Sequence, residues 1–152
     1  MKVRLKLTRN QYRGFAVMAQ NCCNAVNGEH FKAVQYRDVL RNLVLRMAAG
    51  GVSALFDVPV DVLDDLNVAI EESCDLLLHQ DYTAETLTLC CEPKSDGLHV
   101  TLTARERTSQ KEEEPADADI ARLIIQTLVR DVHLDQDEGG VHCVHMTLPA
   151  QV

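Results

Sequence analysis

The sequence predicts an α+β fold, a two-layer sandwich in which a mixed or antiparallel sheet carries its helices on one face. Apolar residues alternate with polar ones near the N-terminus and in several segments of the C-terminal half, which is the period of a half-buried strand. Between those segments they recur at every third or fourth position, the period of an amphipathic helix. The resulting order, β-α-α-α-β-β-loop-α-β-β, is typical of a sheet covered by helices on one side.

The N-terminal half begins with a predicted strand over residues 2–7 and continues with helices. Apolar residues at helical spacing predict helices over 10–26 and 35–49, and Gly50-Gly51 is a typical stop signal for the second. A third helix begins near Asp61. Its expected buried stripe consists of Leu63, Leu66, Ile70, Ser73, Cys74 and Leu77.

The C-terminal half contains two predicted hairpins. Strands over 84–92 and 97–105 are joined by the turn-forming sequence Pro93-Lys94-Ser95-Asp96-Gly97. In the second of these strands, alternation places Leu98, Val100 and Leu102 on one face and His99, Thr101 and Thr103 on the other. Two further strands are expected near 131–136 and 141–148.

A loop and a helix separate the two hairpins. The segment 106–118 is polar and charged, which predicts a loop. The helix that follows runs from about 118 to 130. Its expected inward-facing residues are Ile120, Leu123, Ile124, Thr127 and Leu128.

Composition favours one ordinary globular domain over residues 1–152. Hydrophobic residues make up 46% of the 152 residues, enough for a substantial core. A formal net charge of -8 argues against nucleic acid and anionic membranes as partners, because both attract basic patches. The first residues alternate instead of forming an apolar run, so we expect no signal peptide and a cytoplasmic location. The 6 cysteines are expected to be reduced.

One cluster has the chemistry of metal ligands, His142-Cys143-x-His145. On a regular strand Cys143 and His145 share a face, while His142 points away. Two ligands are too few for a zinc site. A third would have to come from a neighbouring strand, where the candidates are Cys90, Cys91, His99 and His133. The alternative is an ordinary sheet face with a few polar residues.

Two predicted helices resemble those of a known fold. The ATPase fold shared by histidine kinases, DNA gyrase-type ATPases and bacterial anti-sigma-factor serine kinases has an early helix similar to Leu66-Asn67-Val68-Ala69-Ile70-Glu71-Glu72-Ser73-Cys74. Its last helix is similar to Ile124-Ile125-Gln126-Thr127-Leu128-Val129-Arg130-Asp131-Val132. The anti-sigma kinases are the nearest in size and layout. The resemblance implies an ATPase-like core over 35–148, preceded by a strand and helix extension over 1–34.

The early helix of that family carries a glutamate and, four residues later, an asparagine that holds magnesium and its water shell. Aligned without gaps, Glu72 takes the glutamate's position and is the implied catalytic residue, while Leu76 stands in place of the asparagine. A shift of one residue instead aligns Glu71, Asp75 and His79 along one side of the helix, with Asp75 as the implied magnesium ligand. The alternative for these three residues is a solvated helix face.

The family's phosphate-binding glycine turns have no counterpart here. The segment Thr103–Ser109 stands in place of its Asp-x-Gly-x-Gly turn, and Asp119-Ile120-Ala121-Arg122 in place of its Gly-x-Gly turn. Side chains at these positions obstruct the approach of phosphates to backbone amides. Polyphosphate would also be repelled by the nearby carboxylates of Glu112, Glu113, Glu114, Asp117 and Asp119.

We therefore expect no cofactor, and the resemblance implies a nucleotide site that has degenerated. If Mg-ATP did bind, the residues implied in holding it are Glu72, Asp75, His79, Arg105 and Arg122.

The implied function is that of a degenerate anti-sigma-factor-like regulatory protein of bacterial type, which acts by binding another protein. The implied partner is a sigma factor or an anti-sigma antagonist. Family members also dimerise, which implies an interface on residues 10–50 that includes Phe15, Met18, Phe31, Tyr36 and Leu40. The alternative is an active ATP-dependent serine/threonine protein kinase. A third hypothesis is an unrelated α+β domain.

Overall fold

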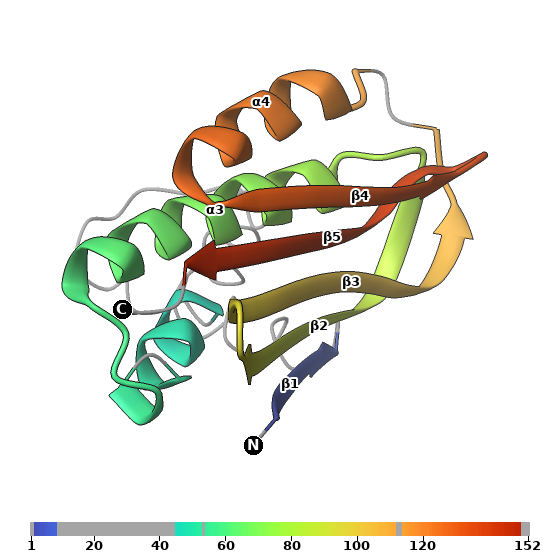
Figure 1. Cartoon of the computed structure of the whole chain (residues 1–152). Coiled ribbons are helices and arrows are strands. Elements are labelled where there is room, and N and C mark those ends of the chain that lie inside the picture. The colour runs from blue at the N-terminus through green and yellow to red at the C-terminus, as the bar shows by residue number, and fades with distance from the viewer. Residues whose placement is uncertain (1, 9–44, 53, 112–113, 150–152) are drawn as a thin grey trace, which may run out of the picture.

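The computed structural model describes residues 2–8, 45–52, 54–111 and 114–149 (Figure 1). Within these ranges the helices and strands follow one another in the predicted order. They are, in chain order, β1 (Val3–Thr8), α3 (Val60–Leu78), β2 (Tyr82–Lys94), β3 (Gly97–Ser109), α4 (Ala118–Leu128), β4 (Asp131–Asp137) and β5 (Gly140–Pro149). Residues 45–52 and 54–55 are also helical.

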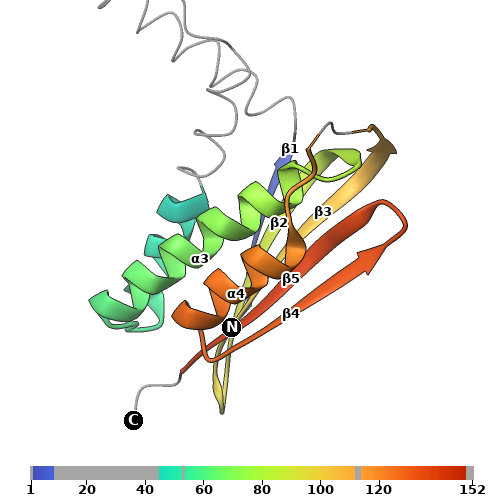
Figure 2. The same ribbon diagram turned by 90° about the horizontal axis from the view of Figure 1, so that it is seen from above.

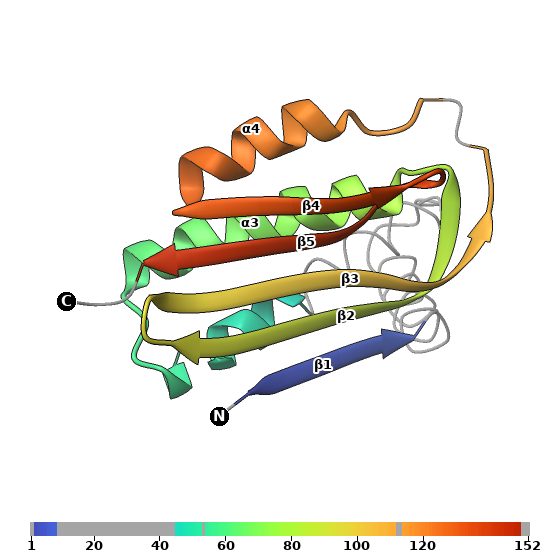
Figure 3. The ribbon, with the colours of Figure 1, turned by 45° about the vertical axis from the view of Figure 1, so that its right-hand side comes forward.

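The strands form one sheet in the order β1-β2-β3-β5-β4, and every pair of neighbours is antiparallel (Figure 3). The helices α3 and α4 lie side by side on one face of this sheet (Figure 2). The predicted α+β two-layer sandwich is therefore confirmed, with an antiparallel sheet. No helix among the described residues is long and apolar enough to cross a membrane.

The core lies between the sheet and the helices. In β3, Leu98, Val100 and Leu102 are buried against α3, while the residues between them are only half-buried on the opposite face, as the alternation predicts. On α3, Leu66 and Ile70 are fully buried. Burying an aliphatic side chain of this size stabilises the fold by about 1.5–3 kcal/mol.

The predicted inward face of α4 is wrong. Ile120 is 58% exposed, Leu123 63% and Ile124 37%, whereas the buried residues are Ala121 and Ile125. The helix carries apolar side chains on more than one stripe, so helical periodicity alone fits two faces. Packing against α3 selects the stripe that begins with the small side chain of Ala121. It leaves an apolar stripe of α4 facing outward, with Thr127 also exposed. Leu128, also in the predicted inward set, is half-buried and does pack against the core.

The predicted helix stop at Gly50-Gly51 is also wrong, because residues 45–52 are helical throughout. Leu45, Ala49 and Val52 are 0%, 0% and 4% exposed, so a buried stripe at helical spacing continues across the glycines. That burial outweighs the cost of about 0.5–1 kcal/mol for each glycine inside a helix. The predicted helix over 10–26 and the proposed interface residues Phe15, Met18, Phe31, Tyr36 and Leu40 lie outside the described residues.

The first hairpin is longer than its sequence pattern suggests. The strand β3 continues to Ser109, so the predicted loop over 106–118 is wrong for its first residues. Thr108 and Ser109 pair with Thr83 and Tyr82 of β2. Polar residues form a strand here because a partner strand satisfies their backbone groups, which composition alone does not reveal.

Candidate functional site

Leu76, the residue in place of the family's asparagine, lies on the buried side of α3. It is 1% exposed and belongs to the hydrophobic core. An asparagine at this position would therefore end in the core rather than at a solvent-facing ligand site.

The carboxylates of α3 lie together on the side of the helix that faces solvent. Asp75 is exposed, and its carboxylate Oδ1 is 3.3 Å from Nδ1 of His79, which also lies 2.9 Å from the Asp75 carbonyl oxygen. Glu71 pairs with Arg46, with 3.6 Å between Oε2 and Nη1. Burial raises the pKa of Glu72, and the neighbouring charges of Asp75 and Glu71 raise it further. Glu71 and Asp75 are therefore exposed groups with local partners, whereas Glu72 and His79 are half-buried on the same helix.

The two arginines of the predicted set lie elsewhere. Arg105 follows Thr103 on β3 and lines a groove on the face of the sheet away from the helices. Glu72 projects from α3, which covers the opposite face, so the structure does not bring Arg105 to Glu72. Arg122 is an exposed residue of α4.

The groove beside Arg105 has a volume of about 1470 Å³ and is lined by polar and charged side chains of several strands. Its floor is formed by β3, β4 and β5. On that floor three side chains with metal-ligand chemistry lie close together, Asp135 from β4 and Cys143 and His145 from β5. His133 of β4 is the neighbour of Asp135 outside the groove lining.

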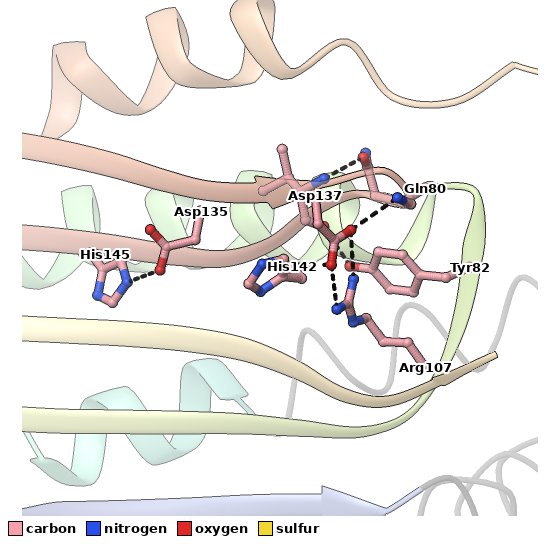
Figure 4. Close-up of polar contacts among 9 residues, drawn as sticks. Gln80, Tyr82, Arg107, Asp135, Asp137, His142 and His145 are labelled. Atoms are coloured by element: carbon pink, nitrogen blue, oxygen red, sulfur yellow. Dashed lines mark hydrogen bonds and ion pairs between the residues drawn. The ribbon is translucent and has the colours of Figure 1, made fainter. Parts of the chain in front are cut away.

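Short distances connect these side chains. Nε2 of His145 is 2.8 Å from Oδ2 of Asp135 and 3.3 Å from Sγ of Cys143 (Figure 4 shows the first contact). Nε2 of His133 is 3.1 Å from the other oxygen of Asp135. The hydrogen bond from His145 holds the pKa of Asp135 below its usual range.

Two threonines of the neighbouring strand β3 support the cluster. Thr101 Oγ1 is 3.3 Å from Nδ1 of His145, and Thr103 Oγ1 is 3.2 Å from Sγ of Cys143. Burial raises the pKa of the Cys143 thiol, while its hydrogen bond with Thr103 acts in the opposite direction.

None of the described cysteines forms a disulfide. Cys74 and Cys91 are buried and Cys90 is half-buried. Burial raises the pKa of Cys91 to about 12, so its nucleophilic thiolate form is scarce at neutral pH. Cys22 and Cys23 lie outside the described residues.

The prediction that His142 points away from Cys143 and His145 is wrong, because β5 is irregular at this residue. Asp135 pairs with Cys143, and Gln136 pairs with Val141, so His142 is an extra residue between two register positions. Such a bulge redirects a side chain. The imidazole lines the same groove, and its Nε2 is 3.9 Å from Oδ2 of Asp137 (Figure 4).

The groove is also lined by an ion pair between Arg107 and Asp137. Arg107 donates two hydrogen bonds to Asp137, from Nη1 at 3.1 Å and from Nη2 at 2.6 Å. Its guanidinium also lies 5.2 Å from the centre of the Tyr82 ring, which is within range of a cation–π contact (Figure 4). The Arg107 hydrogen bonds are the main reason that the pKa of Asp137 is lowered to about 2.

This pair predicts a specific loss of stability in acid. Because the folded-state pKa of Asp137 is depressed to about 2, its contribution is present above the ordinary carboxyl pKa and is lost as the pH falls toward 2. Urea unfolding at several pH values should therefore show a steeper decline between about pH 4 and 2 for the wild type than for Arg107→Gln. Arg122→Gln is the matched control, and equal slopes for the wild type and Arg107→Gln would contradict the assignment.

The sequence pattern suggested only part of the cluster. The pattern of histidines and cysteines indicates His133 as a possible third ligand and does not include Asp135. The indication was available: His133-x-Asp135 and Cys143-x-His145 have the same alternate spacing on two strands predicted to form a hairpin. Cys90, Cys91 and His99 are not members of the cluster.

Comparisons with known proteins do not identify the family of this chain. The sequence matches no known protein family and no curated protein.

Proposed function

We propose that this chain is a cytoplasmic regulatory protein that acts by binding another protein, and that it is a divergent relative of the anti-sigma-factor serine kinases in which the ATP site has been lost. The observation that carries the proposal is the burial of Leu76, which is 1% exposed. A buried leucine at the magnesium-binding position provides no oxygen to a hard cation.

The alternative alignment gives little support to ATP binding. It makes Asp75 the magnesium ligand, and Asp75 lies exposed beside His79. Asp75 forms a group of negative charges with Glu71 and Glu72 on the same helix. These charges would repel a polyphosphate.

The N-terminus of α4, which the resemblance implies as a phosphate position, also supports the proposal. The N-terminus of α4, where a phosphate would accept backbone hydrogen bonds, is capped by the chain itself. Asp117 Oδ1 accepts hydrogen bonds from the amides of Asp119 at 2.9 Å and Ile120 at 3.2 Å. These amides are therefore already satisfied, and the capping carboxylate disfavours a second anion.

The segment in place of the Asp-x-Gly-x-Gly turn also supports a divergence from the ATPase family. The segment Thr103–Ser109 is extended and paired with β2. Within it Glu106 has a φ of 54°, a backbone conformation that glycine adopts freely and glutamate rarely.

The surface proposed for protein binding is the outward stripe of α4, formed by Ile120, Leu123 and Ile124. Their exposed fractions are 58%, 63% and 37%. Adjacent apolar side chains that the fold leaves uncovered are typical of a protein contact. The proposed occupant is a sigma factor or an anti-sigma antagonist.

One observation favours an active serine/threonine kinase as the second candidate function. The raised pKa of Glu72 is a property of carboxylates that act as general bases. In that case Mg-ATP is the cofactor, and Glu72 or Glu71 acts together with Asp75.

The test is a titration of the full chain against purified sigma factors and their antagonists, with and without Mg-ATP. We expect binding of one of them to be independent of ATP and to weaken at least tenfold, or by about 1.4 kcal/mol, in Leu123→Glu. Gln126→Glu, on an exposed position of the same helix, is the matched control and should bind normally. Binding that requires ATP, phosphate transfer to the partner, or normal binding by Leu123→Glu would contradict the proposal.

A further inference from the structure

The His133, Asp135, Cys143 and His145 cluster is built from two directly opposed residue pairs of the β4–β5 hairpin. His133 is the cross-strand partner of His145, and Asp135 is the partner of Cys143. Residues two apart on a strand share a face, and opposed residues on antiparallel strands have Cβ atoms only about 4.5–5.5 Å apart. The backbone therefore places four donor side chains at the corners of one small rectangle.

These donors have the chemistry of a zinc site. A thiolate, two imidazoles and a carboxylate are the ligand types that tetrahedral Zn²⁺ takes in proteins. We propose that His133, Asp135, Cys143 and His145 bind one divalent zinc-type ion on the face of the sheet away from the helices. This inference is independent of the proposed function, because it does not involve α3, α4 or a nucleotide.

The distances agree with one shared ion. Metal–ligand bonds of about 2.0–2.3 Å at tetrahedral angles put ligand atoms about 3.3–3.8 Å apart. The ligand atoms of Asp135, Cys143 and His145 all lie within 4.8 Å of one another, with His145 Nε2 at 2.8 and 3.3 Å from the other two. Small side-chain rotations convert this arrangement into a coordination shell.

His133 supplies the fourth ligand. Its Nε2 is already 3.1 Å from Asp135, and the centre of its ring lies 6.1 Å from that of His145. Its side chain is 73% exposed, so it can rotate toward the ion without disturbing the core.

The surrounding hydrogen bonds orient the ligands as metal sites require. In the structure Nε2 of His145 is hydrogen-bonded to Asp135. When an ion binds, Nε2 gives up that proton and its lone pair faces the ion, while Nδ1–H can donate to Thr101 Oγ1 at 3.3 Å. Thr103 lies 3.2 Å from Sγ of Cys143 and can donate its hydroxyl proton to the thiolate. Such partners fix the ring orientation and the tautomer of a ligating histidine.

Co²⁺ is the probe, because its visible spectrum reports tetrahedral geometry and a thiolate ligand gives a separate charge-transfer band. Added to the reduced, metal-free full chain at neutral pH, Co²⁺ is expected to produce both features at one equivalent, and Zn²⁺ should displace it. Cys143→Ser should abolish the thiolate band. Thr101→Val should keep the band and weaken binding by about 10–100-fold.

The control is Cys90→Ser. Cys90 is a half-buried thiol opposite Thr101 on the neighbouring strand, and its replacement should leave the spectrum unchanged. His145→Gln and His133→Ala, each checked for folding by circular dichroism, should weaken binding more than Thr101→Val does. The proposal is overturned if the wild type gives no tetrahedral spectrum, if the thiolate band survives in Cys143→Ser, or if folded His145→Gln binds as the wild type does.

Discussion

Replacing Leu76 with asparagine is expected to destabilise the chain by about 2–5 kcal/mol without creating an ATP site. The side chain is 1% exposed and belongs to the hydrophobic core between α3 and the sheet. Asparagine removes the apolar contacts there and buries an amide, whose transfer without hydrogen bonds costs roughly 1–3 kcal/mol by mutational data. An asparagine at position 76 should therefore damage the fold.

The measurement is urea unfolding followed by circular dichroism. Leu55→Asn is the matched control, because Leu55 is 63% exposed and its replacement should change the free energy of unfolding by less than about 0.5 kcal/mol. An unchanged stability for Leu76→Asn, or a variant that gains Mg-ATP binding, would contradict the placement of this side chain.

The second large effect is expected at Gln80, a buried residue that joins α3, the segment before α4 and β5. Its Nε2 donates to the carbonyl oxygens of Leu76 at 2.9 Å, His79 at 3.2 Å and Ala116 at 3.4 Å. Its Oε1 accepts from the amide of Val141 at 2.9 Å (Figure 4). Gln80→Met keeps the volume but removes these hydrogen bonds, and each buried group that is left unpaired costs about 1–3 kcal/mol. The carbonyl oxygen of His79 still accepts from the amide of Ala116.

Thermal and urea unfolding of Gln80→Met should show a loss of at least about 2 kcal/mol. Gln126→Met replaces an exposed glutamine of α4 and should be close to neutral. A Gln80→Met variant as stable as this control would show that the hydrogen bonds of Gln80 contribute little.

Much of the fold could be predicted because the hydrophobic pattern is clear in elements that bury one face and expose the other. In β3, buried Val100 and Leu102 alternate with half-buried Thr101 and Thr103, and the strand is found where that pattern places it. The stripe of α3 through Leu66 and Ile70 is equally regular, and both residues are buried. Such elements satisfy their local pattern and the global packing at once.

The inner face of α4 and the position of His142 could not be predicted, because each depends on contacts distant in sequence. Periodicity allows α4 to bury either Ile124 or Ile125, and packing on α3 selects Ile125. The bulge that redirects His142 depends on the register of β4 against β5. Asp135 meets His145 through that same register, so the alternate spacing of the two strands indicates a shared face but not which residues are opposed.

The most direct test of the proposed loss of the ATP site is the melting temperature of the full chain in millimolar Mg-ATP. A ligand that binds only the native state stabilises it by RT ln(1 + [L]/Kd), about 2.7 kcal/mol at one hundred times Kd. We predict no shift relative to magnesium alone. A rise of several degrees that ADP shares and magnesium alone does not would contradict the account and favour the kinase.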